Sequence, residues 1–336
     1  MNPALETLML AFSSEGGIPV PGRSLFLGAE AHPLLKGWQN LTTVQPHKPL
    51  AQAWSRAGLA PLVDPPEGRW PLVLVLPGKS RDEILASFAM ARDRLEPGGT
   101  LVAALTNTSG AARFEKDLKR TTGAITSIQK NKSRAFHAID DGTWNESLFA
   151  EWRSLGVPRL IPGTGFTTQA GVFSHGRIDA GSRLLVDCLP SDLHGNVADL
   201  GAGWGYLSAE VLRFCPKIEH LHLFESDSRA LACARANLAT SDRKITYHWH
   251  DVTTALPGSY DFILTNPPFH TGRATDVDLG RAFLKTASFA LKRRGRLFLV
   301  ANRQLPYESV LKAEGLTWQR LAEDKTYKVL AVEKGS

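Results

Sequence analysis

Asn266, Pro267, Pro268 and Phe269 follow an apolar run that has the character of a buried strand. Proline lacks the backbone N–H that a strand ladder needs and restricts the residue before it, so the strand must end here. The Asn266 side-chain oxygen and the Pro267 carbonyl then lie at the carboxyl edge of a sheet, where open α/β folds bind ligands. Two fixed acceptors beside the Phe269 ring could hold a planar amino group by accepting both of its hydrogens. A Pro-Pro turn that binds nothing is the alternative reading of this motif alone.

A second segment that could bind a ligand is Asp199-Leu200-Gly201-Ala202-Gly203-Trp204-Gly205, between a predicted strand and a predicted helix. Glycines permit a tight turn and a close approach of the backbone to a ligand. Dinucleotide-binding turns usually keep Gly-x-Gly-x-x-Gly and face a pyrophosphate, whereas this turn has Gly-x-Gly-x-Gly with an acid ahead of it. The acid would repel pyrophosphate and attract a cation. S-adenosylmethionine, which carries an ammonium and a sulfonium, fits such a turn.

Two further acids end the next predicted strands. Glu225 lies about twenty residues beyond the glycines, where nucleotide-binding folds place an acid against the ribose hydroxyls. Asp251, followed by Val252, ends the next strand and could receive the adenine amino group. Taken alone, each acid could equally be a solvated strand end or a helix cap. However, four polar residues occur in order at four successive predicted strand ends: Asp199, Glu225, Asp251 and Asn266.

These patterns define two sets of site residues. The set predicted to bind the cofactor is Asp199, Gly201, Ala202, Gly203, Gly205, Glu225, Asp251, Val252 and Asn266. The set predicted to act on the amino group is Asn266, Pro267, Pro268 and Phe269. The three cysteines have no close spacing typical of a metal site, so no metal is expected.

The elements that position these residues alternate between strand and helix, which predicts parallel βαβ units in an α/β fold. In the second half we expect helices over 179–189, 228–239 and up to Leu291, and a closing antiparallel hairpin around Glu323-Asp324-Lys325. The first half carries a strand ending at Leu27, another at 72–76, a helix over 82–95 and a hairpin around Lys130-Asn131-Lys132.

The two halves resemble each other in order and pattern. Pro97-Gly98-Gly99 matches Arg293-Arg294-Gly295 ahead of a late strand, and Leu76-Pro77-Gly78 matches Asn266-Pro267-Pro268. The first half has Glu30 and His32 where the second has glycines, and we expect a buried carboxylate and side chains to fill the ligand space there. We therefore predict a duplicated fold in which only the second copy keeps its ligand. The expected divisions are 1–143, a connecting helix and linker over 144–170, and 171–336.

Composition narrows the functional classes. The chain has 336 residues, 43% hydrophobic and 21% charged, which is ordinary for a globular protein. We recognise no signal peptide and no apolar run near the roughly 20 residues of a membrane helix, so we expect a cytoplasmic protein. A net charge of +6 favours an anionic partner such as RNA. The candidate RNA contacts are Lys130, Lys132, Arg134, Lys292, Arg293 and Arg294.

The glycine turn with its acids resembles the class I S-adenosylmethionine-dependent methyltransferases. The Asn-Pro-Pro-Phe segment is similar to the signature of those that methylate amino groups on planar systems. Gly171-Val172-Phe173-Ser174 with Asp179 and Gly181, Asn266 to Gly272, Leu305-Pro306-Tyr307 and Tyr327-Lys328-Val329 narrow the resemblance further. Together they resemble the ribosomal RNA guanine-N2 methyltransferases of the RsmC/RlmG type.

This resemblance implies two tandem Rossmann-like class I methyltransferase domains with a degenerate N-terminal copy. It implies methylation of guanine N2 in ribosomal RNA, with 16S RNA of the small subunit favoured over 23S. The expected partner is ribosomal RNA, a ribosomal subunit or an assembly intermediate, and the expected state is a monomer.

Other readings stay open on the motifs alone. Adenine N6 and the side-chain amide of a protein glutamine present the same NH2 geometry to Asn266. A non-enzymatic ribosome-assembly factor with a vestigial cofactor pocket is a third reading. The intact set of Asp199, Glu225, Asp251 and Asn266 argues against such decay, because no structural need accounts for all four.

Overall fold

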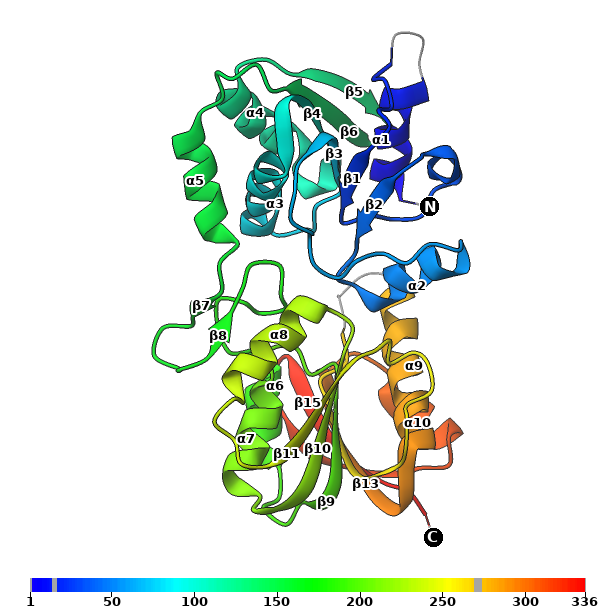
Figure 1. Ribbon diagram of the computed structural model, residues 1–336. Helices are drawn as coiled ribbons and strands as arrows, with labels where there is room; N and C mark the ends of the chain where they lie inside the picture. The colour runs from blue at the N-terminus through cyan, green and yellow to red at the C-terminus, as the bar shows by residue number, and fades with distance from the viewer. Residues whose placement is uncertain (1, 14–16, 269–273, 336) are drawn as a thin grey trace. The chain divides into compact units, whose positions relative to one another are not determined.

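The computed structural model describes residues 2–13, 17–268 and 274–335, which form two units (Figure 1). The first unit comprises Met1–Pro158 with Gln169–Gly171, and the second comprises Arg159–Thr168 with Val172–Ser336. Each unit is built around one large sheet with helices on both faces. None of the helices in the described part of the chain combines the length and apolar character needed to cross a lipid bilayer.

The sheet of the second unit has seven strands in the order β11-β10-β9-β12-β13-β15-β14. The first five of these are parallel, and β15 pairs antiparallel with both β13 and β14. The strands are β9 (His194–Leu200), β10 (Lys217–Glu225), β11 (Lys244–Trp249), β12 (Tyr260–Thr265), β13 (Leu291–Asn302), β14 (Thr317–Glu323) and β15 (Tyr327–Glu333). The predicted closing hairpin is therefore present as β14 and β15.

Helices cover this sheet on both sides. One face packs under α6, α7 and α8, and the other under α9 and α10 (Figure 1). Successive residues of one strand serve opposite cores, since Val197 faces the first set of helices and Ala198 the second. This double burial explains why the central strands read as continuous apolar runs. The helices are α6 (Ala180–Cys188), α7 (Tyr206–Phe214), α8 (Ser228–Asn237), α9 (Ala274–Ala290) and α10 (Tyr307–Ala313).

The first unit has a six-stranded sheet in the order β2-β1-β3-β4-β6-β5. Its strands are β1 (Ser24–Leu27), β2 (Leu41–Val44), β3 (Trp70–Val75), β4 (Leu95–Thr106), β5 (Thr126–Lys130) and β6 (Ser133–Ile139). Its α-helices are α1 (Pro3–Ser13), α2 (Lys48–Arg56), α3 (Arg81–Asp93), α4 (Ala111–Thr122) and α5 (Glu146–Leu155). Short 3-10 helices, η1 and η2, span Pro33–Gly37 and Asn107–Ser109.

The predicted duplication is confirmed by strand order. Removing the edge strand β11 from the second sheet leaves β10-β9-β12-β13-β15-β14, which repeats β2-β1-β3-β4-β6-β5 element for element. The late strands β4 and β13 both contain 12 residues and share one pattern of buried and exposed positions. Backbone detail agrees as well, because Gly28 and Gly201 have φ values of 68° and 71°, and Gly98 and Arg294 have 76° and 61°.

The first copy differs where the second carries its glycine turn. The chain after β1 enters η1, which begins with a proline, in place of a counterpart to α7. The Ala29 carbonyl accepts hydrogen bonds from the side chains of Gln45 (2.8 Å) and Trp54 (2.9 Å). Glu30, expected as a buried carboxylate, is half-buried and accepts a 2.7 Å hydrogen bond from Asn2. Side chains of this unit thus engage the turn itself.

The connector expected over 144–170 is divided between the two units. Helix α5 packs on α3 in the first unit, because Phe149 and Trp152 bury their rings in that core and Arg153 pairs with Asp93. The stretch expected as a linker forms a small ladder in the second unit, β7 (Arg159–Leu160) against β8 (Thr167–Thr168).

Candidate active site

The carboxyl ends of four neighbouring parallel strands bring the predicted polar residues to one edge of the second sheet. Leu200 at the end of β9 is in register with Phe224 of β10 on one side and Thr265 of β12 on the other. Glu225, Gly201 and Asn266 are the next residues of these three strands. Asp251 follows β11, which pairs with the outer side of β10. Asn266 therefore lies at the same edge as the glycine turn.

The glycine turn is held by backbone hydrogen bonds to the neighbouring strand. The N–H groups of Gly201 and Ala202 both donate to the Phe224 carbonyl, at 2.8 and 3.1 Å. Gly201, Gly203 and Gly205 have φ values of 71°, 55° and 87°, a region that favours glycine. A Cβ on Gly205 would lie 3.1 Å from Ala234 Cβ, whereas one on Gly203 would meet no atom within 4 Å. The turn is packed on one side and open at Gly203.

Asp199 supplies a buried carboxylate beside this turn. Its side chain is fully buried, and Oδ2 accepts a 2.7 Å hydrogen bond from Ser208 Oγ. Oδ1 is buried with no hydrogen-bond partner among the described residues. Burial raises the pKa of Asp199 to about 7, the Ser208 hydrogen bond opposes this, and the nearby Glu225 carboxylate adds to it. A buried, ionised carboxylate oxygen without a partner is stabilised when a cation pairs with it.

Glu225 connects the end of β10 to the turn. Its Oε2 accepts a 2.8 Å hydrogen bond from the Gly203 N–H, and Oε1 accepts from the Asp227 N–H at 2.8 Å. Burial raises the pKa of this carboxyl group, while those backbone hydrogen bonds oppose the rise. Oε1 also accepts from Ser226 Oγ at 3.2 Å, whereas Oε2 has a second lone pair that can still accept a hydroxyl. The open position at Gly203 and the unpartnered Asp199 oxygen fit S-adenosylmethionine, and Glu225 fits its ribose.

Asp251 and Val252 form the outer end of the predicted cofactor set. Asp251 is half-buried, and its Oδ1 accepts from the Thr253 N–H (2.9 Å) and hydroxyl (2.7 Å). Val252 is 2% exposed and packs into the core on the α9 side. One oxygen of Asp251 therefore closes a local turn, and the contact with an adenine stays a prediction.

Asn266 has two partners that sequence reasoning missed. Its Nδ2 donates to Asp179 Oδ2 at 2.9 Å and to Ser182 Oγ at 2.8 Å. Asp179 stood out as a site residue only through the family resemblance, although an Asp directly ahead of a predicted helix was a recognisable N-cap signal. Pro267 is buried and Pro268 is exposed. Phe269 lies outside the described residues, so its stacking role stays a prediction.

Three of the six basic residues predicted to contact RNA lie in the first unit and three in the second. Lys130 and Lys132 are exposed at the turn between β5 and β6, whereas Arg134 is half-buried and paired with Glu115. Lys292 is paired with Asp261 at 2.8 Å. Arg293 and Arg294 are exposed where β13 begins, the end of that strand opposite to the active-site edge. The three in the second unit therefore do not lie beside Asn266.

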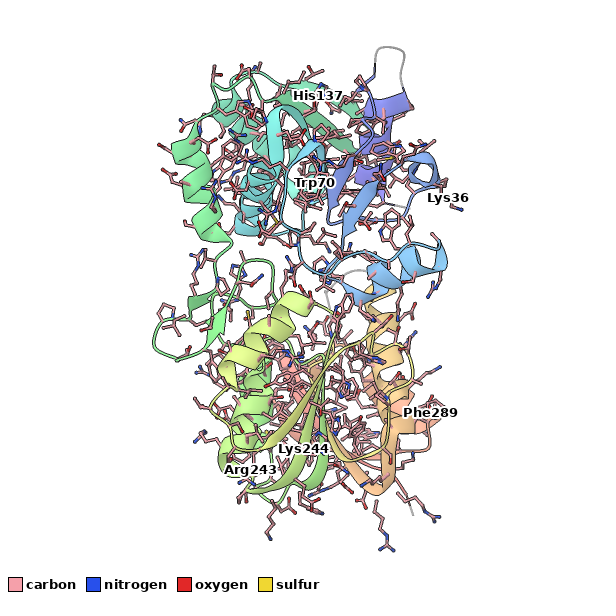
Figure 2. The ribbon with its side chains drawn as sticks, viewed as in Figure 1. Lys36, Trp70, His137, Arg243, Lys244 and Phe289 are labelled. Atoms are coloured by element: carbon pink, nitrogen blue, oxygen red, sulfur yellow. The ribbon has the colours of Figure 1, made fainter. Side chains whose placement is uncertain are left out.

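A hollow lies at the amino edge of the same sheet. Its lining includes Arg243 and Lys244, which are labelled in Figure 2. Its volume is about 860 Å³. Cationic and anionic side chains line it in nearly equal number, so the charge of the lining favours neither an anionic nor a cationic ligand. The lining residues are Asp192, His194, Pro216, Lys217, Ile218, Glu219, Asp242, Arg243 and Lys244. Across the described ranges, no cluster of three or more His, Cys, Asp or Glu side chains could hold a metal ion.

Known proteins are similar to this chain in sequence and in overall fold. Residues 163–331 match the family described as the methyltransferase small domain. A ribosomal RNA small subunit methyltransferase C from Psychromonas ingrahamii is 29% identical over 73% of this chain and 70% of its own length. The protein of the same name from Vibrio vulnificus is 31% identical over 72% of this chain and 71% of its own. Further relatives of that name align over about half of each chain.

One solved structure matches this chain across both units. The T. thermophilus 16S rRNA N2 guanine methyltransferase, in complex with AdoMet and guanosine, superposes with a TM-score of 0.82 at 26% sequence identity. The match covers 99% of this chain and 92% of that one.

Proposed function

This chain belongs to the methyltransferase small-domain family, and we propose that it transfers a methyl group from S-adenosylmethionine to the exocyclic N2 amine of a guanine in 16S ribosomal RNA. The relatives named as small-subunit rRNA methyltransferases support this RNA, and the structural neighbour with bound guanosine supports this base. One observation carries the proposal: the Asn266 amide is held by its NH2 group at the edge where the glycine turn opens.

The cofactor is proposed to lie along the carboxyl edge of β9, β10 and β11. The unpartnered Oδ1 of Asp199 would accept the ammonium, and Glu225 would accept the ribose hydroxyls. Asp251 and Val252 would border the adenine, and Gly203 would leave room for the backbone to approach. When bound, S-adenosylmethionine supplies a methyl group already activated by the positive sulfur.

The chain's own contribution to chemistry is to position and polarise the amine. The exocyclic nitrogen of guanine is a weak nucleophile, because its lone pair is delocalised into the ring. Asn266 Oδ1 and the Pro267 carbonyl would accept its two hydrogens, which localises the lone pair and directs it out of the ring plane. After transfer the nitrogen is acidic and releases a proton to water, so no strong base is needed. Phe269 would stack on a base turned out of the RNA.

The first unit is proposed as a degenerate copy that binds RNA rather than cofactor. Its turn after β1 is engaged by Gln45 and Trp54, and η1 replaces the helix that a cofactor turn normally opens. Lys130 and Lys132 are exposed on its hairpin, where their ammonium groups can reach a phosphate. A monomer acting in the cytoplasm, on free rRNA, a subunit or an assembly intermediate, completes the proposal.

Separated small and large ribosomal subunits, and naked 16S RNA, provide the test. Each is incubated with the protein and S-adenosylmethionine labelled in its methyl group, and the label is located in RNA or in protein. Label in 16S RNA, free or in the small subunit, is expected. Label confined to 23S RNA or to ribosomal protein would refute the proposed substrate.

A further inference from the structure

We propose that Asp179 and Ser182 are positioning residues for methyl transfer, because they fix the orientation of the Asn266 amide. This inference rests on the proposed function, since it assigns them a role in presenting the Asn266 oxygen to the amine. Neither residue would touch the substrate for this purpose. Both would act through Asn266, 87 and 84 residues away in sequence.

The two contacts leave one chemically sensible orientation of the amide. Nδ2 lies 2.9 Å from a carboxylate oxygen of Asp179, and a carboxylate accepts hydrogen bonds but donates none. A flipped amide would set its oxygen against that carboxylate with no hydrogen between them. The NH2 group must therefore face Asp179, and Ser182 Oγ lies 2.8 Å from the same nitrogen. Both acceptors engage Nδ2, so Oδ1 is the amide atom left for the substrate.

Asp179 and Ser182 lie at the start of α6, where further contacts hold the backbone in place. Asp179 is the N-cap of α6, and the oxygen that contacts Asn266 also accepts a 2.8 Å hydrogen bond from the Ser182 N–H. A Cβ on Gly181 would lie 3.0 Å from the Tyr327 ring, so the first turn of α6 packs closely on β15. This support leaves Asp179 and Ser182 little freedom to follow a moving amide.

The consequence is a requirement on the rate of transfer rather than on binding. Without the two acceptors, the amide could rotate and present its NH2 group to the amine of the substrate, where two donors would oppose each other. The fraction of molecules with a correctly oriented acceptor would fall, and misplacing a reacting group by about 1 Å can cost about 100-fold in rate. We therefore expect kcat to fall while the affinity for S-adenosylmethionine is unchanged.

Asp179→Gly, Ser182→Ala and Asp179→Asn separate positioning from folding. Glycine is tolerated at an N-cap almost as well as Asp, so Asp179→Gly removes the hydrogen bond to Asn266 at little cost to the helix. Asp179→Asn keeps an oxygen that can accept from both Asn266 and the Ser182 N–H. The matched control is Asn145→Gly, which removes an N-cap side chain from α5 in the first unit.

Kinetics at saturating RNA and cofactor give the first readout. Asp179→Gly should lower kcat by about tenfold or more, with Ser182→Ala lower by a smaller factor. Cofactor affinity should stay within twofold, and Asp179→Asn should stay within a few-fold of the original kcat. Asn145→Gly should leave kcat unchanged. An unchanged kcat in Asp179→Gly, or a parallel loss of cofactor affinity and melting temperature, would overturn the inference.

NMR of the side-chain amides gives a readout that does not depend on catalysis. With asparagine labelled in nitrogen, the Asn266 NH2 signal is assigned by its loss in Asn266→Ala. It should show two slowly exchanging hydrogen-bonded protons in the original chain and faster exchange in Asp179→Gly. If the original protein methylates no ribosomal RNA, the proposed function fails while this measurement still tests the orientation. Fast exchange of the Asn266 NH2 protons in the original chain would refute the proposed orientation of the amide.

Discussion

The Thr265 hydroxyl donates a 2.8 Å hydrogen bond to the carbonyl of Leu200, and both residues are fully buried. They are also in register as the last residues of β12 and β9. Asn266 and Gly201 are the next residue on each strand, so the backbone ladder and this side-chain bond set the spacing between them. The spacing between the amide that holds an amino group and the turn that holds a methyl donor is thus built into the centre of the sheet.

Replacing Asn266 with Ala should abolish transfer without unfolding the protein. The change removes one of the two acceptors for the amine, and losing a single positioned hydrogen-bonding group at a reacting centre typically lowers kcat by about 100-fold or more. The side chain is only half-buried, so the melting temperature should change little. Single-turnover methylation measures the loss of transfer, and thermal unfolding measures the melting temperature. Full activity in this variant would remove the proposed role of Asn266.

Binding of S-adenosylmethionine should strengthen as pH rises through about 7. Asp199 has a pKa of about 7 because it is buried, and only its ionised form attracts the ammonium. Raising the pH from 6 to 8 ionises this carboxyl group before the cofactor binds, so less free energy is used to release its proton. Titration calorimetry across this range should show a rising affinity for the original chain. Asp199→Asn should bind more weakly and lack this part of the pH dependence; an identical pH profile in both proteins would contradict the assignment.

Two glycines of one turn should respond differently to alanine. Both have positive φ, which costs an L-residue roughly 1–2 kcal/mol. Gly205→Ala also brings Cβ to 3.1 Å from Ala234, so it should lower the melting temperature more. Gly203→Ala projects Cβ into the open side proposed for the cofactor. The stabilisation by added S-adenosylmethionine should therefore be lost in Gly203→Ala and retained in folded Gly205→Ala. The reverse pattern would place the cofactor elsewhere.

The protein should lose stability as pH falls below about 6.5, partly through the histidines on β10 and β11. The His222 ring lies 3.8 Å from that of His220 and 5.4 Å from that of His248. Burial first, and then these rings and Lys244, lower the pKa of His222 to about 4. The unfolded chain binds a proton near its ordinary value of 6.5 and the folded chain does not until about pH 4, so unfolding is favoured across that window.

Urea unfolding at pH 7.5 and pH 5 measures this histidine effect. His222→Gln removes the titrating ring, so the difference in unfolding free energy between the two pH values should be smaller in the variant. An equal difference in both proteins would assign the pH dependence to other groups.

RNA affinity should depend on Lys130 and Lys132 more than on the paired cations. Both lysines are exposed, whereas Arg134 and Lys292 are held by Glu115 and Asp261. Lys130→Ala with Lys132→Ala should weaken binding to 16S RNA and make the slope of log affinity against log salt shallower by about 2. Lys292→Ala is the matched control and should change neither. Equal effects from both variants would argue against the hairpin as an RNA-binding element.

The sequence could predict features that local chemistry determines. Glycine residues indicated the turn at Gly201, and proline residues indicated the strand end at Asn266. Apolar runs indicated the strands between them. The duplicated fold was predicted from several matches that keep their order, such as Pro97-Gly98-Gly99 with Arg293-Arg294-Gly295 and Leu76-Pro77-Gly78 with Asn266-Pro267-Pro268. These signals are short-range, so they can be recognised without knowing how the chain packs.

Features that depend on packing over long sequence separations were missed. The hydrogen bond between Asp179 and Asn266 and the docking of α5 through Phe149 and Trp152 both depend on tertiary structure. The placement of Arg293 and Arg294 at the far edge was implicit in strand direction, since residues at the start of a parallel strand lie opposite to its carboxyl end. Charge alone made them RNA candidates.

The identity of the methylated nucleoside decides whether Asn266 presents a guanine amine to the methyl donor. Small subunits from a strain that lacks this enzyme are methylated with labelled S-adenosylmethionine, and the RNA is hydrolysed to nucleosides and separated. We predict N2-methylguanosine as the labelled product with the original chain and no labelled nucleoside with Asn266→Ala. Label in N6-methyladenosine, or equal N2-methylguanosine from both proteins, would contradict the account.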